Sequence, residues 1–431
     1  MPTSSKEPRQ NGFCRSRGVV QEVSAKPDNI ATLSKAIREG LPQEDGVSLY
    51  VHMPFCVSKC RYCDFNSYAF TNQDLRRHVN AVLTEARLRV ADLKPQTVFL
   101  GGGTPSLLPP DLLRRFLDEL DTICGFRESS LETTMEANPE SLDKATARAV
   151  FEGGVNRLSI GVQSLRPEVL QAYDRVHSPE GALEAFAIAR DVGFRRINLD
   201  LIYAFPGQGE EEWLEDLTTI HALGAEHLSC YELSYEPGTA LTRLKNVGRW
   251  KAAGEETCAA MFGITREANE AAGYEAYEVS AFAKAGEASM HNLSYWRSLD
   301  YVGIGAGAAG WLKGVRRRNI ELPDTYESAI HEGADPVAVS ERLSPEVVLF
   351  DHLMMGLRLP HEGVLISRAQ RLSGLDPMQV HGKEIRESID QGLLEILCDK
   401  GGDRLRTTKR GLLILDDILT RFLPDDPSMS V

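Results

Sequence analysis

The sequence predicts an α/β fold: a partial (β/α)6 barrel of the TIM type, followed by a C-terminal, mostly helical domain that is winged-helix-like. Between residues 47 and 235, short β-rich runs alternate six times with amphipathic helical stretches, which is typical of parallel strands joined by helices. Because six units fall short of the eight that close such a barrel, we expect a partial one. Beyond residue 344 the alternation gives way to a succession of helices.

Six runs rich in β-branched and aromatic residues are the expected strands. They are residues 47–52, 97–103, 131–138, 156–163, 196–205 and 227–234. Five intervening stretches carry apolar residues at helical spacing. They are residues 75–93, 110–123, 141–154, 179–193 and 210–224. We expect Ser141 to cap the third of these helices and Pro110 to open the second. Gly193 and Gly224 are expected just past the ends of the fourth and fifth.

The rest of the chain divides into three parts. Residues 1–46 are polar and lack the apolar segment of a secretory signal, so we expect a partly disordered N-terminal extension before the barrel at 47–240. Residues 241–335 extend the barrel and contain an expected helix near 250–272. Residues 336–431 form the C-terminal domain. Its expected helices are 344–359, 368–374 and 383–397, and a turn or wing at 403–411 is expected before residues 412–423.

Composition excludes several classes of protein. Hydrophobic residues make up 42% and charged residues 26% of the chain, and no apolar run reaches the ~18–20 residues that span a bilayer. We therefore expect a protein that is not integral to the membrane. A net charge of −14 argues against nucleic-acid binding, which needs a basic surface. Five of the eight cysteines are scattered, which indicates reduced thiols and a cytoplasmic location rather than a disulfide framework.

Three cysteines cluster in the sequence CVSKCRYC, as Cys56, Cys60 and Cys63. With His52 they offer four zinc ligands, so a structural zinc site is an open alternative. His52 is expected on a strand, facing the same side as Tyr50, and zinc sites usually pair two close thiols with a second, distant pair. Three thiolates suit a [4Fe–4S] cluster that keeps one iron free for a small molecule. This spacing is the signature of the radical SAM superfamily.

The stretch LYVHMPFCVSKCRYCDFNSY resembles the oxygen-independent coproporphyrinogen III oxidase family, and specifically its heme chaperone branch. The similarity covers residues 47–420. It continues through GGGTPS, EANPESL, NRLSIGVQS, LDLIYAFPGQ, YELSYEPGT and HNLSYW. The resemblance implies that Cys56, Cys60 and Cys63 hold a cluster that donates one electron to S-adenosylmethionine (SAM), whose C–S bond then breaks to give methionine and a 5′-deoxyadenosyl radical.

The resemblance also implies a binding site for SAM. Its expected residues are Tyr50, Tyr62, Gly102, Gly103, Thr104, Glu136, Gln163, Arg175 and Asp200. The glycines permit close approach of the backbone to a ligand, although a tight turn would explain one of them. Glu136, Gln163 and Asp200 fall near the ends of three different strands. Each alone is commonly a helix cap or a surface group, but together they are able to hold ribose hydroxyls and an ammonium group.

HNLSYW, at residues 291–296, matches a motif that the chaperone branch links to heme. His291 is the candidate heme-binding residue, because imidazole ligates heme iron; a packed structural histidine is the alternative. Arg316 to Arg318 either meet heme propionates or form a solvated charge run. Related proteins commonly carry histidine at the position of Ala309, so any role of that histidine is absent here.

Two further sequence features bear on alternative functions, NAD binding and coproporphyrinogen oxidation. Gly305, Gly307 and Gly310 satisfy a dinucleotide-binding fingerprint, but the sequence after them does not open a helix, so we reject NAD binding. The oxidases carry a further cysteine where this chain has Phe65. Phe65 favours the chaperone branch, and we do not expect coproporphyrinogen oxidase activity.

We therefore expect a heme chaperone that binds a [4Fe–4S] cluster, SAM and heme. Its partners would be heme as cargo, acceptor proteins such as membrane respiratory enzymes, and an electron donor. The first alternative is an oxygen-independent coproporphyrinogen III oxidase, which removes propionate carboxyls by a radical route. A structural zinc protein and an RNA-modifying radical SAM enzyme are further alternatives, and the net charge of −14 disfavours the second.

Overall fold

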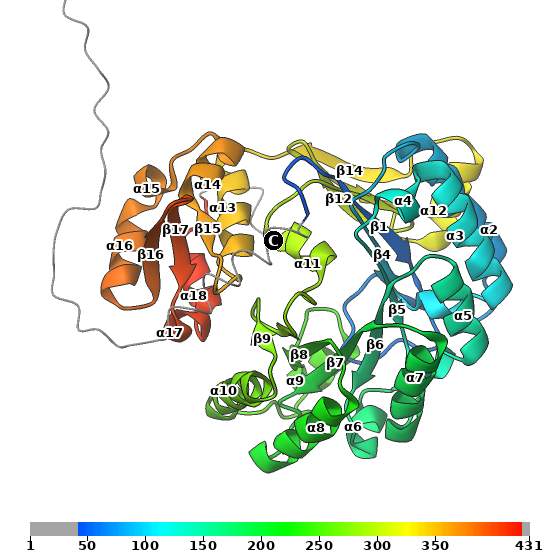
Figure 1. Cartoon of the computed structure of the whole chain (residues 1–431), viewed down its shortest axis with the longest axis horizontal. Helices are drawn as coiled ribbons and strands as arrows, with labels where there is room; N and C mark the ends of the chain where they lie inside the picture. The colour runs from blue at the N-terminus through cyan, green and yellow to red at the C-terminus, as the bar shows by residue number, and fades with distance from the viewer. Residues whose placement is uncertain (1–41, 425–431) are drawn as a thin grey trace, which may run out of the picture. The chain divides into compact units, whose positions relative to one another are not determined.

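The computed structural model describes residues 42–424, so most of the predicted N-terminal extension lies outside the described residues. The predicted α/β fold is confirmed, and all six predicted strands are present with ends that differ by at most two residues. They are β1 (Ser48–Met53), β4 (Thr97–Gly102), β5 (Glu132–Ala137), β6 (Arg157–Gln163), β7 (Arg196–Tyr203) and β8 (His227–Glu232). All five neighbouring pairs are parallel and follow chain order, so their carboxyl ends share one edge (Figure 1).

Helices connect these strands and pack their apolar sides against the sheet (Figure 1). They are α2 (Leu75–Arg89), α3 (Pro110–Cys124), α5 (Lys144–Glu152), α6 (Pro167–Ala172), α7 (Pro179–Val192) and α8 (Glu210–Leu223), with a short α4 (Phe126–Ser129). Gly193 and Gly224 follow α7 and α8 at φ +122° and +73°, as predicted. The prediction for Ser141 is wrong: it ends a 3-10 turn, and the carboxylate of Asp143 accepts the N–H of Thr146 as the cap of α5.

The sheet continues beyond the six parallel strands on both sides. On one side β10 (Ala281–Ala283) pairs antiparallel with β8, and β9 (Glu275–Ala276) follows it. On the other side the chain returns as β11 (Tyr301–Ile304), which pairs parallel with β1. The remaining elements here are β12 (Ala309–Leu312), β13 (Val315–Asn319), β14 (Val337–Arg342), α9 (Ala240–Asn246), α10 (Glu255–Ala271), α11 (Met290–Trp296) and α12 (Pro323–His331).

The glycine-rich stretch at 303–310 is a turn between two strands. The next element is the strand β12, which supports the rejection of a dinucleotide site. Gly305 has φ +102°, and its amide donates to the buried carboxylate of Glu85 at 2.8 Å. A Cβ at Gly305 would overlap the carbonyl oxygen of His52. These glycines therefore allow close packing of the backbone against β1.

The C-terminal domain has its own apolar core. Its elements are α13 (Pro345–Gly356), β15 (Val364–Leu365), α14 (Ile366–Ser373), α15 (Pro377–Val380), α16 (Gly382–Asp390), β16 (Leu394–Asp399), β17 (Gly402–Thr407), α17 (Lys409–Leu412) and α18 (Leu415–Thr420). The prediction of one helix over 383–397 is wrong. Gly392 at φ +68° follows the end of α16, and Leu394 begins a strand that pairs with β17. The segment predicted as a turn or wing is therefore largely one strand of a hairpin.

Candidate cofactor-binding site

The three clustered cysteines lie on one loop beyond β1. Cys56 ends β2 (Phe55–Cys56), which pairs with β3 (Tyr68–Ala69). Cys56, Cys60 and Cys63 are all partly exposed. We call residues 56–67 the cysteine loop. It is anchored through Arg61, whose Nε lies 2.7 Å from a carboxylate oxygen of Asp174 and whose backbone N–H donates to the carbonyl of Tyr173.

The three thiols lie close enough to one another to affect each other's pKa values. Burial raises the pKa of Cys56 to about 11; the Thr104 hydroxyl lowers this pKa, and the Cys63 and Cys60 thiols raise it. Burial likewise raises the pKa of Cys63. Among the described residues, no group of three or more His, Cys, Asp or Glu side chains is arranged to hold a single metal ion. Three neighbouring, partly exposed thiols are a ligand set that suits an iron–sulfur cluster.

His52 is engaged by the protein rather than by the thiols. Its Nδ1 lies 2.8 Å from the Tyr50 hydroxyl, and its Nε2 lies 2.8 Å from the carbonyl oxygen of Asn66. The predicted common orientation of Tyr50 and His52 is therefore confirmed. Burial lowers the pKa of His52 to about 4, so the ring is neutral at neutral pH. With both ring nitrogens occupied, His52 does not complete the ligand set of a zinc ion in this structure.

The predicted glycine run forms a ledge beside the cysteine loop. Gly103 and Thr104 donate their amides to the carbonyls of Met53 and Phe55, at 2.7 and 2.8 Å. The amide of Gly102 donates to a side chain, the carboxylate of Glu136, at 3.0 Å. Gly102 has φ +103°, and a Cβ there would overlap the His52 ring. The ledge therefore requires glycine at this position, and of its three amides that of Gly102 is the one paired with a side chain rather than with the backbone.

Two of the predicted strand-end residues are carboxyls that influence each other. Burial and the neighbouring charge of Asp200 raise the pKa of Glu136 to about 8. Asp200 accepts hydrogen bonds from Asn198 and Ser159, at 2.8 and 3.0 Å, and burial raises its pKa. Gln163 ends β6 with φ +65°, at a shift in the register against β7. Two partly buried carboxyls with raised pKa values are suited to a cationic ligand, which favours their ionised form.

Arg175 joins the cysteine loop to the strand ends. Its Nη1 lies 3.5 Å from the Sγ of Cys60, and its Nη2 donates to Asn138 Oδ1 at 2.8 Å and to the carbonyl of Gly161 at 2.9 Å. Asn138 in turn donates from Nδ2 to the Thr104 hydroxyl at 2.9 Å. The sequence reasoning missed Asn138, although it lies in the EANPESL motif directly after β5.

Tyr62 lies beside the same guanidinium. Its ring packs edge-on against Tyr173, with centroids 5.0 Å apart. Burial raises the pKa of Tyr62 well above its usual value, so the phenol is neutral. Tyr62 therefore lies close to Cys60 and Arg175, whose charges act on its phenol.

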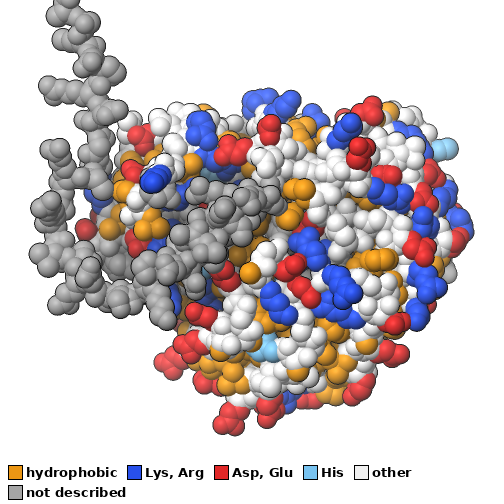
Figure 2. All heavy atoms as spheres, in the orientation of Figure 1, with side chains coloured by type: hydrophobic (Ala, Val, Ile, Leu, Met, Phe, Trp, Pro, Cys, Tyr) orange, Lys and Arg blue, Asp and Glu red, His pale blue; other side chains and the backbone are white. Residues whose placement is uncertain are grey.

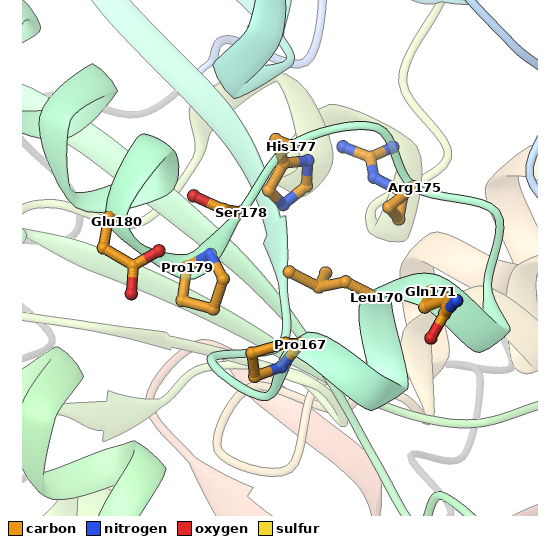
Figure 3. A pocket seen from close by; sticks show the side chains of 8 residues that line it. All are labelled: Pro167, Leu170, Gln171, Arg175, His177, Ser178, Pro179 and Glu180. Carbon is orange, nitrogen blue, oxygen red and sulfur yellow. The ribbon is translucent and has the colours of Figure 1, made fainter.

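A pocket of about 420 Å³ borders Arg175 (Figure 3). It is lined by Pro167, Leu170, Gln171, Arg175, His177, Ser178, Pro179 and Glu180. His177 Nε2 donates to the carbonyl of Val162 at 3.0 Å, and His177 Nδ1 lies 3.5 Å from a carboxylate oxygen of Glu140. Of the residues assigned to SAM, only Arg175 lines this pocket, so the pocket lies beside the predicted SAM site rather than within it.

His291 lies on α11 and is fully buried. Its Nδ1 lies 2.8 Å from the Thr97 hydroxyl and its Nε2 lies 2.7 Å from the Tyr295 hydroxyl. Burial lowers its pKa to about 3. The ring stacks on Phe99, with centroids 5.2 Å apart. In this structure His291 is therefore a neutral, fully hydrogen-bonded residue.

An unbroken series of rings runs through this histidine. Tyr50 and Phe99 lie 6.3 Å apart between centroids, His291 and Tyr295 lie 4.8 Å apart, and Tyr295 and Tyr301 lie 4.6 Å apart. We call Tyr50, Phe99, His291, Tyr295 and Tyr301 the aromatic row. All except His291 are partly exposed, so the row offers ring faces and edges to a flat apolar ligand.

The predicted arginine run lies on β13. Arg316 contacts the carboxylates of Asp351 and Glu341, and Arg318 pairs with Glu321 at 2.8 Å. On the face shown in Figure 2, acidic side chains lie among the basic ones, so positive charge is not gathered into one surface there. Within residues 42–424, no helix is long and apolar enough to cross a membrane.

Family models match two parts of the chain. Residues 50–220 match the radical SAM superfamily, and residues 343–414 match the HemN C-terminal domain. The solved structure of coproporphyrinogen III oxidase (HemN) from Escherichia coli superposes with a TM-score of 0.75 and 21% identity. It covers 91% of this chain and 92% of its own, which shows a shared fold.

Curated relatives match over nearly their whole length. The heme chaperone HemW of Bacillus subtilis is 33% identical, covering 87% of this chain and 99% of that protein. HemW of Escherichia coli is 32% identical, covering 88% and 98%. The mitochondrial radical S-adenosyl methionine domain-containing protein 1 of Mus musculus is 36% identical, covering 88% and 87%.

Proposed function

The chain belongs to the HemW family of heme chaperones within the radical SAM superfamily, and from this membership we propose that it binds heme and transfers it to acceptor proteins. Membership of the superfamily implies a [4Fe–4S] cluster and SAM. The observation that supports the proposal is that Arg175 contacts Cys60 of the cysteine loop and that Gly102 and Glu136 pair with each other near the carboxyl ends of β4 and β5.

The residues present fit the cluster and SAM. Cys56, Cys60 and Cys63 would hold three irons as thiolates, and the cluster, once bound, supplies an electron to SAM. Glu136 and Asp200 would meet the cationic part of SAM, because both carboxyls are partly buried near the strand ends and have raised pKa values. Tyr50, Tyr62, Gln163 and the ledge of Gly103 and Thr104 would complete its surroundings.

We place the heme against the aromatic row. Its partly exposed rings offer the flat apolar contact that a porphyrin needs, and α11 brings the HNLSYW motif into it. To ligate iron, His291 would have to give up one of its two hydrogen bonds. We propose Nε2 as the ligating nitrogen, because its partner Tyr295 is partly exposed, whereas Thr97, the partner of Nδ1, is buried. Arg316, on β13, is the proposed partner of a propionate.

Transfer requires partners that the chain recognises. We propose that heme is the cargo, that the acceptors are heme proteins such as membrane respiratory enzymes, and that an electron donor serves the cluster. We also propose a cytoplasmic location; the free thiols of the described residues, including the buried Cys124 and Cys230, support a reducing compartment.

A hemin titration of anaerobically reconstituted protein tests the proposal. We expect saturable binding to the wild type and at least a tenfold weaker affinity for His291→Ala. Tyr295→Phe keeps the ring but leaves Nε2 without its hydrogen-bond partner, so it should bind hemin at least as tightly as the wild type. Equal affinity of His291→Ala and wild type would remove His291 from the heme site, and no binding by the wild type would refute the function.

A second incubation separates the chaperone from the oxidase. With coproporphyrinogen III, SAM and a reductant, we expect no protoporphyrinogen. Phe65 is 58% exposed on the cysteine loop, at the position where the oxidases carry a cysteine. Measurable protoporphyrinogen formation would overturn a function limited to heme transfer.

A further inference from the structure

Arg175 contacts a cysteine sulfur directly, and this contact has a consequence for electron transfer. Its Nη1 lies 3.5 Å from Cys60 Sγ, a normal separation for an N–H···S hydrogen bond. Resting on the proposed function, in which Cys60 ligates the cluster, we propose that Arg175 is a positioning residue that raises the reduction potential of the cluster by donating to this sulfur.

The direction of the effect follows from charge. A [4Fe–4S] cluster bound by three thiolates is anionic, and it gains one more negative charge when an external reductant such as dithionite supplies an electron. A guanidinium and an N–H···S bond stabilise the more negative form. Removing them therefore makes reduction less favourable.

The guanidinium is held in place on its other side. Nη2 donates both to Asn138 Oδ1 and to the carbonyl of Gly161, so the planar group is fixed by β6 and by the residue after β5. Arg175 comes from the loop after α6, and that loop is tied to the cysteine loop by the Arg61–Asp174 ion pair. Because the guanidinium is planar and its Nη2 is held by two hydrogen bonds, its Nη1 is held in position next to Cys60 Sγ.

The same network reaches the backbone beside a second thiol. Asn138 donates to the Thr104 hydroxyl at 2.9 Å, and the Thr104 amide donates to the carbonyl of Phe55, the residue before Cys56. Arg175 and Asn138 therefore link the Cys60 sulfur to residues at the strand ends rather than to the cysteine loop alone.

The test is a redox titration of the cluster, followed by EPR, in protein that holds neither SAM nor heme. The variants are Arg175→Gln, Arg175→Lys and Asn138→Ala, with Arg61→Gln as the matched control. Arg61 lies on the cysteine loop next to Cys60 and carries the same charge as Arg175, but its Nε pairs with Asp174 rather than with a sulfur. Iron and sulfide contents are measured on every sample.

We expect Arg175→Gln to lower the midpoint potential by an amount equal to about a tenfold change in the reduction equilibrium, or 59 mV for one electron. Arg175→Lys, which keeps the charge but cannot donate to both sides, should fall between Arg175→Gln and the wild type. Asn138→Ala should give a smaller shift in the same direction, and Arg61→Gln, which loosens the anchor of the cysteine loop but leaves the N–H···S bond in place, should give a shift well below that of Arg175→Gln.

Two results would overturn the inference. One is an unchanged potential in a cluster-loaded Arg175→Gln, and the other is an equal shift in Arg61→Gln. If Arg175→Gln assembles no cluster, Asn138→Ala provides the test. An unchanged midpoint potential in that variant would refute the proposal that Asn138 holds Arg175 in position next to Cys60. A wild type that assembles no cluster would refute the proposed function instead, so the two failures are distinguishable.

Discussion

The Nε2 atom of His291 lies 2.7 Å from the hydroxyl oxygen of Tyr295, one turn further along α11. His291 is buried in the fold, and its other ring nitrogen, Nδ1, lies 2.8 Å from the hydroxyl oxygen of Thr97. A residue that the sequence singles out for heme is thus also a structural residue. Its two roles make different predictions.

His291→Ala should lower the free energy of unfolding by about 2–4 kcal/mol, because it leaves a cavity and strips partners from Thr97 and Tyr295. Tyr295→Phe removes one hydrogen bond and should cost about 1 kcal/mol. Urea unfolding of both variants measures the difference. Equal losses in the two variants would show that His291 is not part of the buried network.

The buried histidines make stability fall on acidification. Burial lowers the pKa of His291 to about 3 and that of His52 to about 4. Below a pH of about 6.5 the unfolded chain binds protons that the folded chain excludes, so the free energy of unfolding falls by up to ~1.4 kcal/mol per pH unit for each histidine. Above that pH both states are neutral and the contribution vanishes.

His291→Gln should therefore flatten this profile. Between pH 6.5 and 4.5 the variant should lose about 2–3 kcal/mol less than the wild type. Tyr295→Phe, which retains the titrating ring, is the control and should keep the wild-type slope. Parallel profiles for the wild type and His291→Gln would contradict burial of a neutral imidazole.

Binding of SAM should depend on pH through Glu136. Its pKa of about 8 means that the carboxyl is protonated at neutral pH in the free protein. A cationic ligand favours the ionised form, so binding should release a proton, and affinity should rise as pH approaches 8, by at most about tenfold per unit. Calorimetry of SAM binding in two buffers of different ionisation enthalpy measures the number of protons released.

Glu136→Gln is the matched variant for that measurement. We expect weaker binding that no longer depends on pH in this range and releases no proton through this site. Proton release of the same size in Glu136→Gln would assign the titration to another group.

Gly102→Ala should damage the ledge more than an ordinary glycine substitution. Gly102 has φ +103°, and a Cβ would overlap the His52 ring. We expect a loss of about 3–4 kcal/mol in stability from strain and overlap together. Gly224→Ala, at φ +73° with nothing within 4 Å of its Cβ, should cost only about 1 kcal/mol. Similar melting temperatures for the two variants would contradict the tight fit at the ledge.

Much of the fold follows from local pattern. Alternation of β-rich and amphipathic runs predicts the six strands because parallel strands and their helices carry different periodicities. The failures are local as well. Asp143 competes with Ser141 for the same helix start, and residues 394–397 have a helical pattern although they form part of a strand that pairs with β17. Tertiary pairing, which single-sequence patterns do not contain, decides both.

The candidate site divides in the same way. The spacing of Cys56, Cys60 and Cys63 is a local signal, so the sequence predicts the cysteine loop. The bond from Arg175 to Cys60 joins residues 115 positions apart, and Asn138 gains its role only from that geometry. The burial of His291 depends on packing against Phe99 of β4. These relationships arise from the meeting of separate strand ends, which spacing along the chain does not encode.

The proposed function depends most directly on whether the cysteine loop holds an iron–sulfur cluster or a zinc ion. Iron, acid-labile sulfide and zinc should be measured per chain after anaerobic reconstitution, in the wild type and in Cys60→Ala, with Cys258→Ala as a control away from the loop. We predict about four irons and four sulfides in the wild type and in Cys258→Ala, a large loss in Cys60→Ala, and little zinc. One zinc per chain without sulfide would contradict the account.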